Sequence, residues 1–156
     1  MTEPKKILQT LRAELTLQTR HCRLLEAQEQ ALLLCDRAQF TSLQTAYVQL
    51  LPELKAQDAE CRAVLKDDAG AALTLSALKD FVPAGSLPGL PALENSLRRV
   101  LDRVQTLTRR NLELIQNELD YLAFTLDLFV EAGRCTDNGY GGRGRQIGRL
   151  LLDRVA

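Results

Sequence analysis

Aromatic and β-branched side chains are scarce in this chain of 156 residues. It has no tryptophan, three tyrosines and four phenylalanines, and its three isoleucines and seven valines stand against 32 leucines. β-Sheets favour aromatic and β-branched residues, whereas leucine, alanine, glutamine, glutamate and arginine are strong helix formers. The composition therefore predicts an all-α fold and excludes folds built on a sheet.

Histidine and closely spaced cysteines, on which much catalysis and metal binding depend, are also few. His21 is the single histidine, and no C-x-x-C pair occurs among Cys22, Cys35, Cys61 and Cys135. Zinc sites and dithiol redox centres need closely spaced ligands, and the P-loop, G-x-S-x-G and EF-hand motifs are absent from the sequence. We therefore predict neither an enzyme nor a catalytic, metal or cofactor site. The thiols are interpreted as small core or surface residues.

The chain has no excess of one charge and no long apolar run. Its 20 basic and 20 acidic residues balance, which gives no general attraction to nucleic acid or to an anionic membrane. The first residues do not resemble a secretory signal. The apolar stretch Tyr121–Val130 is interrupted by Thr125 and Asp127 and is shorter than the roughly 20 residues that span a bilayer. We expect a cytoplasmic protein without membrane insertion.

Leucines at three- and four-residue spacing predict a first helix from after Pro4 to about Leu34. Three further apolar residues lie next to this stripe and widen the apolar face of the helix. A wide apolar face suits a bundle in which the helix has more than one neighbour. The predicted inner stripe is Leu8, Leu11, Leu15, Gln18, Cys22, Leu25, Glu29 and Leu32, and the widening residues are Leu17, Leu24 and Ala31.

A second helix is predicted to begin after Asp36, because the Asp36 carboxylate can accept the free amide hydrogen of Gln39. It is expected to end near residues 67–70. Pro52 lies inside its pattern, and proline lacks the amide hydrogen that a helix needs. We therefore expect a kink or a new start near Leu51.

The longest predicted helix covers residues 92–132, after a short extra helix over residues 71–81 and a proline-rich linker over residues 82–91. Arginines prevail in its first part, and only acidic charges follow from Glu113 to Glu131. We interpret both charge clusters as solvated faces. Three long helices of this kind predict an elongated antiparallel helical bundle or coiled coil. The stripe of the longest helix is Leu93, Leu97, Val100, Leu101, Val104, Leu107, Leu112, Ile115, Leu119, Leu122, Leu126 and Phe129.

Six of the nine glycines lie in residues 133–156, where apolar residues are few before Ile147. We therefore predict a bundle domain over residues 1–132 and a flexible Gly/Arg-rich tail over residues 133–156. A helix formed near the end of the tail would need a surface to pack on, because short helices are unstable alone. That surface is either the chain's own bundle or a partner protein. The apolar residues that share one face of this helix are Ile147, Leu150, Leu151 and Val155.

Three degenerate motifs occur in a shared order along nearly the whole chain. They are the leucine-rich segment Leu24–Asp36, the N-L-E-L-I sequence Asn111–Ile115 in the last helix, and the Y-G-x-x-G element Tyr140–Gly144. In this order and spacing the chain resembles the FlgN-type flagellar export chaperones. The resemblance implies a cytoplasmic helical bundle that binds hook–filament junction (hook-associated) proteins, prevents their premature association and delivers them to the flagellar type III export gate.

The resemblance also implies roles for individual residues. Tyr140 matches the tyrosine of the family element and would contact the export gate, and the substrate protein would bind at Leu122, Leu126, Phe129, Ile147, Leu150, Leu151 and Val155. From the pattern alone, Leu122, Leu126 and Phe129 fit the core of the bundle, Tyr140 fits a loop aromatic, and Asn111 fits a polar residue that sets helix register.

Two other functions stay open at this point. One is a structural coiled-coil adaptor or homo-oligomer without a chaperone role. The other is an RNA-binding helper that uses the arginines and glycines of the tail, although that segment has only one interleaved aromatic residue, Tyr140, and a small net charge.

Overall fold

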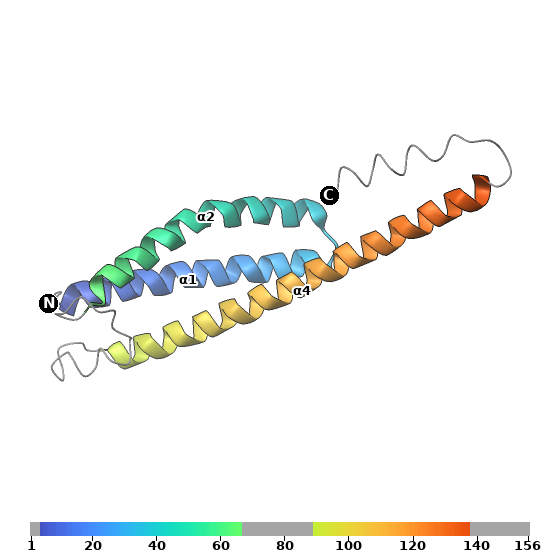
Figure 1. Ribbon diagram of the computed structural model, residues 1–156. Helices are drawn as coiled ribbons and strands as arrows, with labels where there is room; N and C mark the ends of the chain where they lie inside the picture. The colour runs from blue at the N-terminus through green and yellow to red at the C-terminus, as the bar shows by residue number, and fades with distance from the viewer. Residues whose placement is uncertain (1–3, 67–88, 138–156) are drawn as a thin grey trace. The chain divides into compact units, whose positions relative to one another are not determined.

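The computed structural model describes residues 4–66 and 89–137 and consists mainly of three helices (Figure 1). These are α1 (Pro4–Leu33), α2 (Arg37–Val64) and α4 (Leu90–Asp137). The prediction of an all-α bundle is confirmed for these residues. The predicted short helix over residues 71–81 lies outside the described residues.

The turn between α1 and α2 forms as the sequence predicts. Cys35 adopts a φ of 54°, and this left-handed conformation ends α1. The Asp36 amide donates to the carbonyl of Ala31 at 2.9 Å, and the Cys35 amide donates to that of Leu32 at 3.1 Å. The Asp36 carboxylate then accepts the Gln39 amide hydrogen at 2.9 Å. The predicted cap at Asp36 is therefore confirmed.

Helix α2 passes through Pro52 as one helix. Of the two outcomes predicted near Leu51, a kink or a new start, the new start does not occur, because Pro52 is exposed and its ring meets solvent on the outer side of the helix. Its missing amide hydrogen removes only one backbone hydrogen bond, and the turns on both sides hold the helix together. The ribbon of α2 bends along its length in Figure 1.

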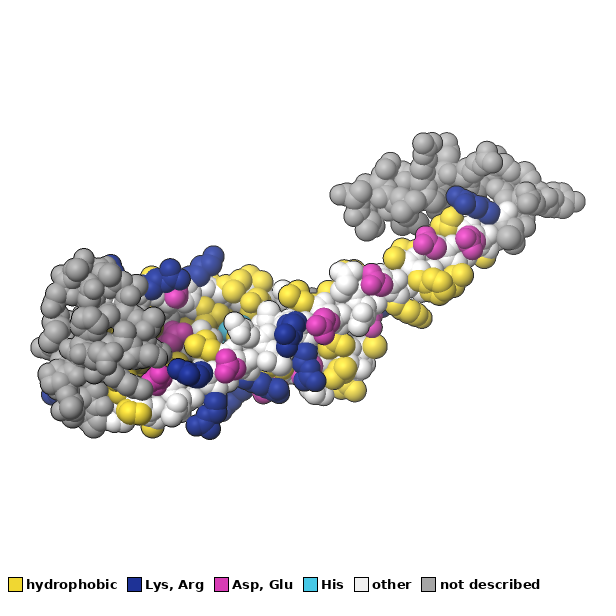
Figure 2. Space-filling view, turned by 60° about the horizontal axis from the view of Figure 1, so that its bottom comes forward, with side chains coloured by type: hydrophobic (Ala, Val, Ile, Leu, Met, Phe, Trp, Pro, Cys, Tyr) yellow, Lys and Arg dark blue, Asp and Glu magenta, His cyan; other side chains and the backbone are white. Residues whose placement is uncertain are grey.

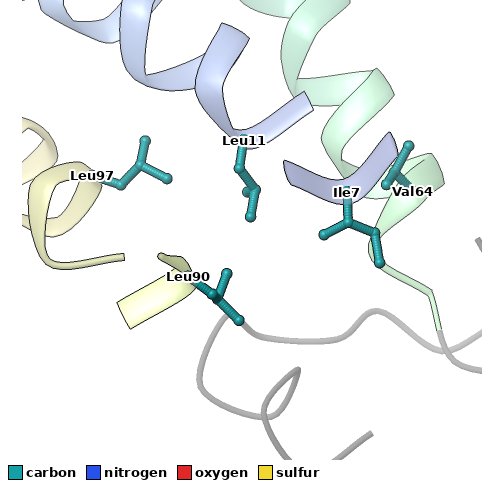
Figure 3. Close-up of a cluster of buried hydrophobic side chains, with 5 residues drawn as sticks. All are labelled: Ile7, Leu11, Val64, Leu90 and Leu97. Carbon is teal, nitrogen blue, oxygen red and sulfur yellow. The ribbon is translucent and has the colours of Figure 1, made fainter. Parts of the chain in front are cut away.

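A hydrophobic cluster joins the three helices near one end of α1 (Figure 3). Its members are Ile7 and Leu11 of α1, Val64 of α2, and Leu90 and Leu97 of α4, all at most 5% exposed. The cluster brings the start of α1 together with the end of α2 and the start of α4. Helix α2 therefore runs opposite to α1, and α4 runs in the same direction as α1.

The buried face of α1 is wider than the predicted stripe. Ile7 and Gln28 are each 4% exposed, whereas Leu8 and Glu29, which the stripe includes, are only partly buried. A helix with neighbours on two sides buries residues beyond a single three–four seam, which explains the difference.

Polar contacts fix α4 lengthwise on α1. The Asn111 side chain is 5% exposed and donates from Nδ2 to the carbonyl oxygen of Leu25 at 3.0 Å. Arg103 contacts Glu26 at 3.2 Å, and Arg110 pairs with Glu29 at 3.4 Å. Arg103 and Arg110 belong to the basic part of α4, and both stay exposed while they make these contacts, so the interpretation of that cluster as a solvated face holds for them.

Helix α4 is longer than predicted at both ends. It begins at Leu90 because Pro91 lies in its first turn, where a missing amide hydrogen removes no helical bond. At the other end it continues through Gly133 to Asp137 instead of stopping near Ala132. A single glycine lowers helix stability by only about 1 kcal/mol, which the neighbouring helix formers offset.

The chain divides into two compact units between Leu114 and Ile115, inside α4. Contacts with α1 reach Asn111, close to this division. The predicted domain boundary after residue 132 stays a prediction.

Candidate functional site

The part of α4 that follows the division is a helix with large apolar side chains on its surface. Four of them follow one another at spacings of three and four residues and therefore share one side of the helix. We call this set the first apolar face: Leu119, Leu122, Leu126 and Phe129, which are 54%, 39%, 55% and 71% exposed. Figure 2 shows hydrophobic side chains along the surface of this part of α4, with acidic side chains between them.

Three predicted binding residues, Leu122, Leu126 and Phe129, thus lie together on the first apolar face. All three are exposed, so the described residues give no support to their alternative interpretation as bundle core. Contiguous exposed apolar surface on a protein commonly marks a site where another protein binds. The remaining predicted residues, Tyr140, Ile147, Leu150, Leu151 and Val155, lie outside the described residues.

A second exposed set was missed from the sequence. Tyr121, Phe124 and Leu128 are 64%, 60% and 49% exposed and also follow a three–four spacing. We call them the second apolar face. Two residues, or about 200° of helical rotation, separate Leu126 from both Phe124 and Leu128, so the two faces lie on opposite sides of the helix. The three–four spacing of these residues is a signal for this face in the sequence. The leucine stripe on the other side of the helix is longer and therefore dominates the pattern.

Between Glu113 and Glu131 the charge of α4 is entirely acidic, and Arg134 follows in the last turn of the helix. From Glu113 to Glu131 the helix contains five acidic residues and neither lysine nor arginine. Glu113, Asp120, Asp127 and Glu131 have no ion pair within 4.0 Å among the described residues, whereas Glu118 takes part in an interaction. This surface therefore suits a partner that combines apolar side chains with positive charge.

Two of the described thiols, those of Cys61 and Cys22, have raised pKa values. Burial and the nearby Glu14 carboxylate raise the pKa of the Cys61 thiol to about 11. Burial, followed by Glu26, raises the pKa of Cys22, and Arg103 opposes this in part. Thiols that stay protonated near neutral pH are weak nucleophiles. Among residues 4–66 and 89–137, no group of three or more His, Cys, Asp or Glu side chains is placed to hold a metal ion.

His21 is buried between α1 and α2. Its ring lies 5.6 Å from the ring of Tyr47, and its Nδ1 lies 3.3 Å from Oε1 of Gln18. The Nε2 atom is buried without a hydrogen-bond partner in the described part of the chain. Burial lowers the pKa of His21, so the neutral ring packs as part of the core.

The three helices pack through buried leucines, and the later part of α4 carries exposed apolar faces. Such exposed faces are typical of a surface that binds another protein. A family model described as FlgN protein matches residues 1–147. The chain belongs to the FlgN family. The resemblance seen in the sequence is thereby confirmed, and FlgN proteins are flagellar export chaperones that act on hook-associated proteins. Neither the curated proteins nor the solved structures include a match to this FlgN chain. None of its described helices is long and apolar enough to cross a membrane.

Proposed function

We propose that this chain is a cytoplasmic chaperone for hook–filament junction proteins. It binds them before export, prevents their premature association and delivers them to the gate of the flagellar type III export apparatus. The family supports the chaperone role in general, and the choice of junction proteins, the delivery step and the cytoplasmic location are our proposal.

The observation that carries the proposal is the exposure of the first apolar face. Burying a leucine or phenylalanine side chain is worth about 1.5–3 kcal/mol, so four such residues supply a strong driving force for binding. An amphipathic helix of a junction protein would lay its apolar side along Leu119, Leu122, Leu126 and Phe129. The apolar side of the junction protein would then be covered and unable to bind a second junction protein. In this way the chaperone would prevent premature association of the junction proteins.

Residues of the C-terminal tail complete this proposal. Ile147, Leu150, Leu151 and Val155 would add apolar contacts to the bound substrate protein, and Tyr140 would contact the export gate. The role of Tyr140 rests on its match to the family element, and the roles of the four apolar residues rest on the resemblance to the family. A Tyr140→Ala variant is expected to retain the junction protein while losing affinity for the purified cytoplasmic part of the gate. Loss of both interactions, or of neither, would contradict this role for Tyr140.

Calorimetric titration with a purified junction protein tests the role of the first apolar face. We expect Leu126→Gln/Phe129→Gln to bind at least about 100-fold more weakly, because it removes two apolar contacts and each tenfold in affinity corresponds to about 1.4 kcal/mol. The matched control is Leu33→Gln/Val48→Gln, which alters side chains that are 57% and 56% exposed on α1 and α2. The control should bind like the parent chain. Equal binding by both variants, with unchanged circular dichroism, would refute the proposed site.

A homodimer that buries the same face is the second candidate, and the uncovered leucines favour it. Sedimentation equilibrium decides between the two. A chain that stays monomeric at tens of micromolar and still binds a junction protein supports the chaperone, whereas a tight dimer without such binding supports the adaptor.

A further inference from the structure

The second apolar face is not used by the proposed binding mode. Tyr121, Phe124 and Leu128 lie on the side of α4 opposite to Leu126, so one helix that lies on the first apolar face cannot cover them. A helix with apolar residues on two opposite sides normally has a neighbour on each side. The second apolar face therefore needs an occupant of its own.

Acidic residues line the second apolar face. Asp120 lies four residues before Phe124, and Asp127 and Glu131 lie three and seven residues after it. These spacings bring the three carboxylates to the side of the helix that carries Phe124. All three are exposed, and no ion pair holds them among the described residues. The occupant should therefore be apolar and positively charged.

We propose that the occupant is the chain's own C-terminal segment, residues 143–156. It has four arginines against one aspartate, a formal net charge of +3, beside Ile147, Leu150, Leu151 and Val155. This combination complements a face that is apolar and lined by acids. A second copy of α4 fits less well, because it would bring a second row of carboxylates against the first.

The length of the chain allows this contact. Nine residues, 138–146, separate the end of α4 from Ile147, and nine residues span up to about 30 Å when extended. Tyr121 lies 16 residues before Asp137, which is about 24 Å along the helix. The segment can therefore reach every residue of the second apolar face of its own helix. Joining the two partners in one chain also gives an effective concentration on the order of millimolar, so a short segment can dock without high intrinsic affinity.

The docked segment leaves the first apolar face open to a substrate protein. The assignment of the first apolar face to a substrate protein rests on the proposed function, but the docking of residues 143–156 on the second apolar face does not. A substrate protein that also contacts Ile147 or Leu151 must first displace the segment from α4, which couples substrate binding to release of the C-terminus.

The absence of tryptophan provides a direct test in the free protein. Phe124→Trp places a single tryptophan on the second apolar face, and Leu126→Trp places one on the first. We expect the emission of Phe124→Trp to shift to longer wavelength when Leu151→Asp is added, because the docked segment no longer shields the indole. The emission of Leu126→Trp should not change with Leu151→Asp.

Leu152→Asp is the matched control for Leu151→Asp, because it introduces the same charge one position outside the predicted apolar side of the segment. We expect it to leave the emission of Phe124→Trp at the shorter wavelength. The shorter wavelength should also persist on dilution, since the contact is within one chain.

Three outcomes would overturn the inference. They are solvent-like emission from Phe124→Trp in the full chain, equal shifts with Leu151→Asp and Leu152→Asp, and a short-wavelength emission that disappears on dilution. The last would assign the face to a second copy. No substrate protein is present in this experiment, so its failure leaves the proposed chaperone function untouched.

Discussion

The two parts of α4 have the same leucine spacing and opposite surroundings. In the first part, Leu97 and Leu107 are 1% and 0% exposed and pack within the bundle. In the second part, Leu119 and Leu126 continue the same spacing and are more than half exposed. The difference teaches that a three–four apolar stripe predicts a helix that needs a neighbour, but not whether that neighbour belongs to the same chain.

The largest expected effect comes from removing a core leucine. Leu107→Ala should lower the free energy of unfolding by about 2–5 kcal/mol, because it leaves a cavity in a fully packed site. Leu126→Ala, the same substitution in the exposed part of α4, should change it by less than about 0.5 kcal/mol. Urea unfolding monitored by circular dichroism measures both. Similar losses would mean that the second part of α4 is covered in the free chain.

The next effect concerns the polar contact between α1 and α4. Asn111→Ala should destabilise the bundle by about 1–3 kcal/mol, because the buried carbonyl oxygen of Leu25 loses its side-chain donor. Asn117→Ala, at an exposed position of the same helix, is the control and should have little effect. A neutral result for Asn111→Ala would show that the hydrogen bond sets register without adding stability.

A smaller effect is expected near the end of α4. Gly133 is helical, and an added Cβ there would have no heavy atom within 4 Å. Gly133→Ala should therefore stabilise the local helix by about 0.5–1 kcal/mol through the lower entropy of the unfolded chain. Amide hydrogen exchange near residue 133 should slow, while exchange around Leu107 stays unchanged. Slower exchange in both places would indicate that the two parts of α4 unfold together.

The smallest effect is a pH dependence of the free energy of unfolding, which arises from His21 in the bundle and not from the exposed part of α4. Burial lowers the pKa of His21 below its ordinary value of 6.5, so the unfolded chain takes up the proton at a higher pH than the folded chain. The contribution of His21 to the free energy of unfolding therefore has its full value above about pH 6.5. It decreases as the pH falls toward the lower pKa of the folded state. Urea unfolding on both sides of this window measures the slope. His21→Gln should flatten it, and an unchanged slope would assign the dependence to carboxylates.

Several parts of the fold could be predicted because they depend on neighbouring residues in the chain. The Asp36 cap needs only a carboxylate three residues before a free amide, and α1 needs only its repeating leucines. The new start near Leu51, one of the two outcomes predicted there, does not occur because tertiary packing and the flanking helical turns outweigh one missing hydrogen bond. The predicted end of α4 near Ala132 is too early, because the helix formers around Gly133 outweigh the cost of one glycine.

The candidate site was predicted in part. Leu122, Leu126 and Phe129 were named from the sequence, but their exposure could not be, since the same stripe serves core and interface. Tyr121, Phe124 and Leu128 were missed because apolar residues on the opposite side of a helix contribute little to a single dominant stripe.

The three long helices, the cap between the first two of them and the family follow from the sequence, because each depends on local hydrogen bonding or on the order of motifs. Which leucines are buried depends instead on tertiary packing. Within the first unit, α1 pairs with α4 through the hydrogen bond of Asn111 to Leu25. In the second unit, the large apolar residues of α4 are exposed, and those residues are the surface that the proposed function needs.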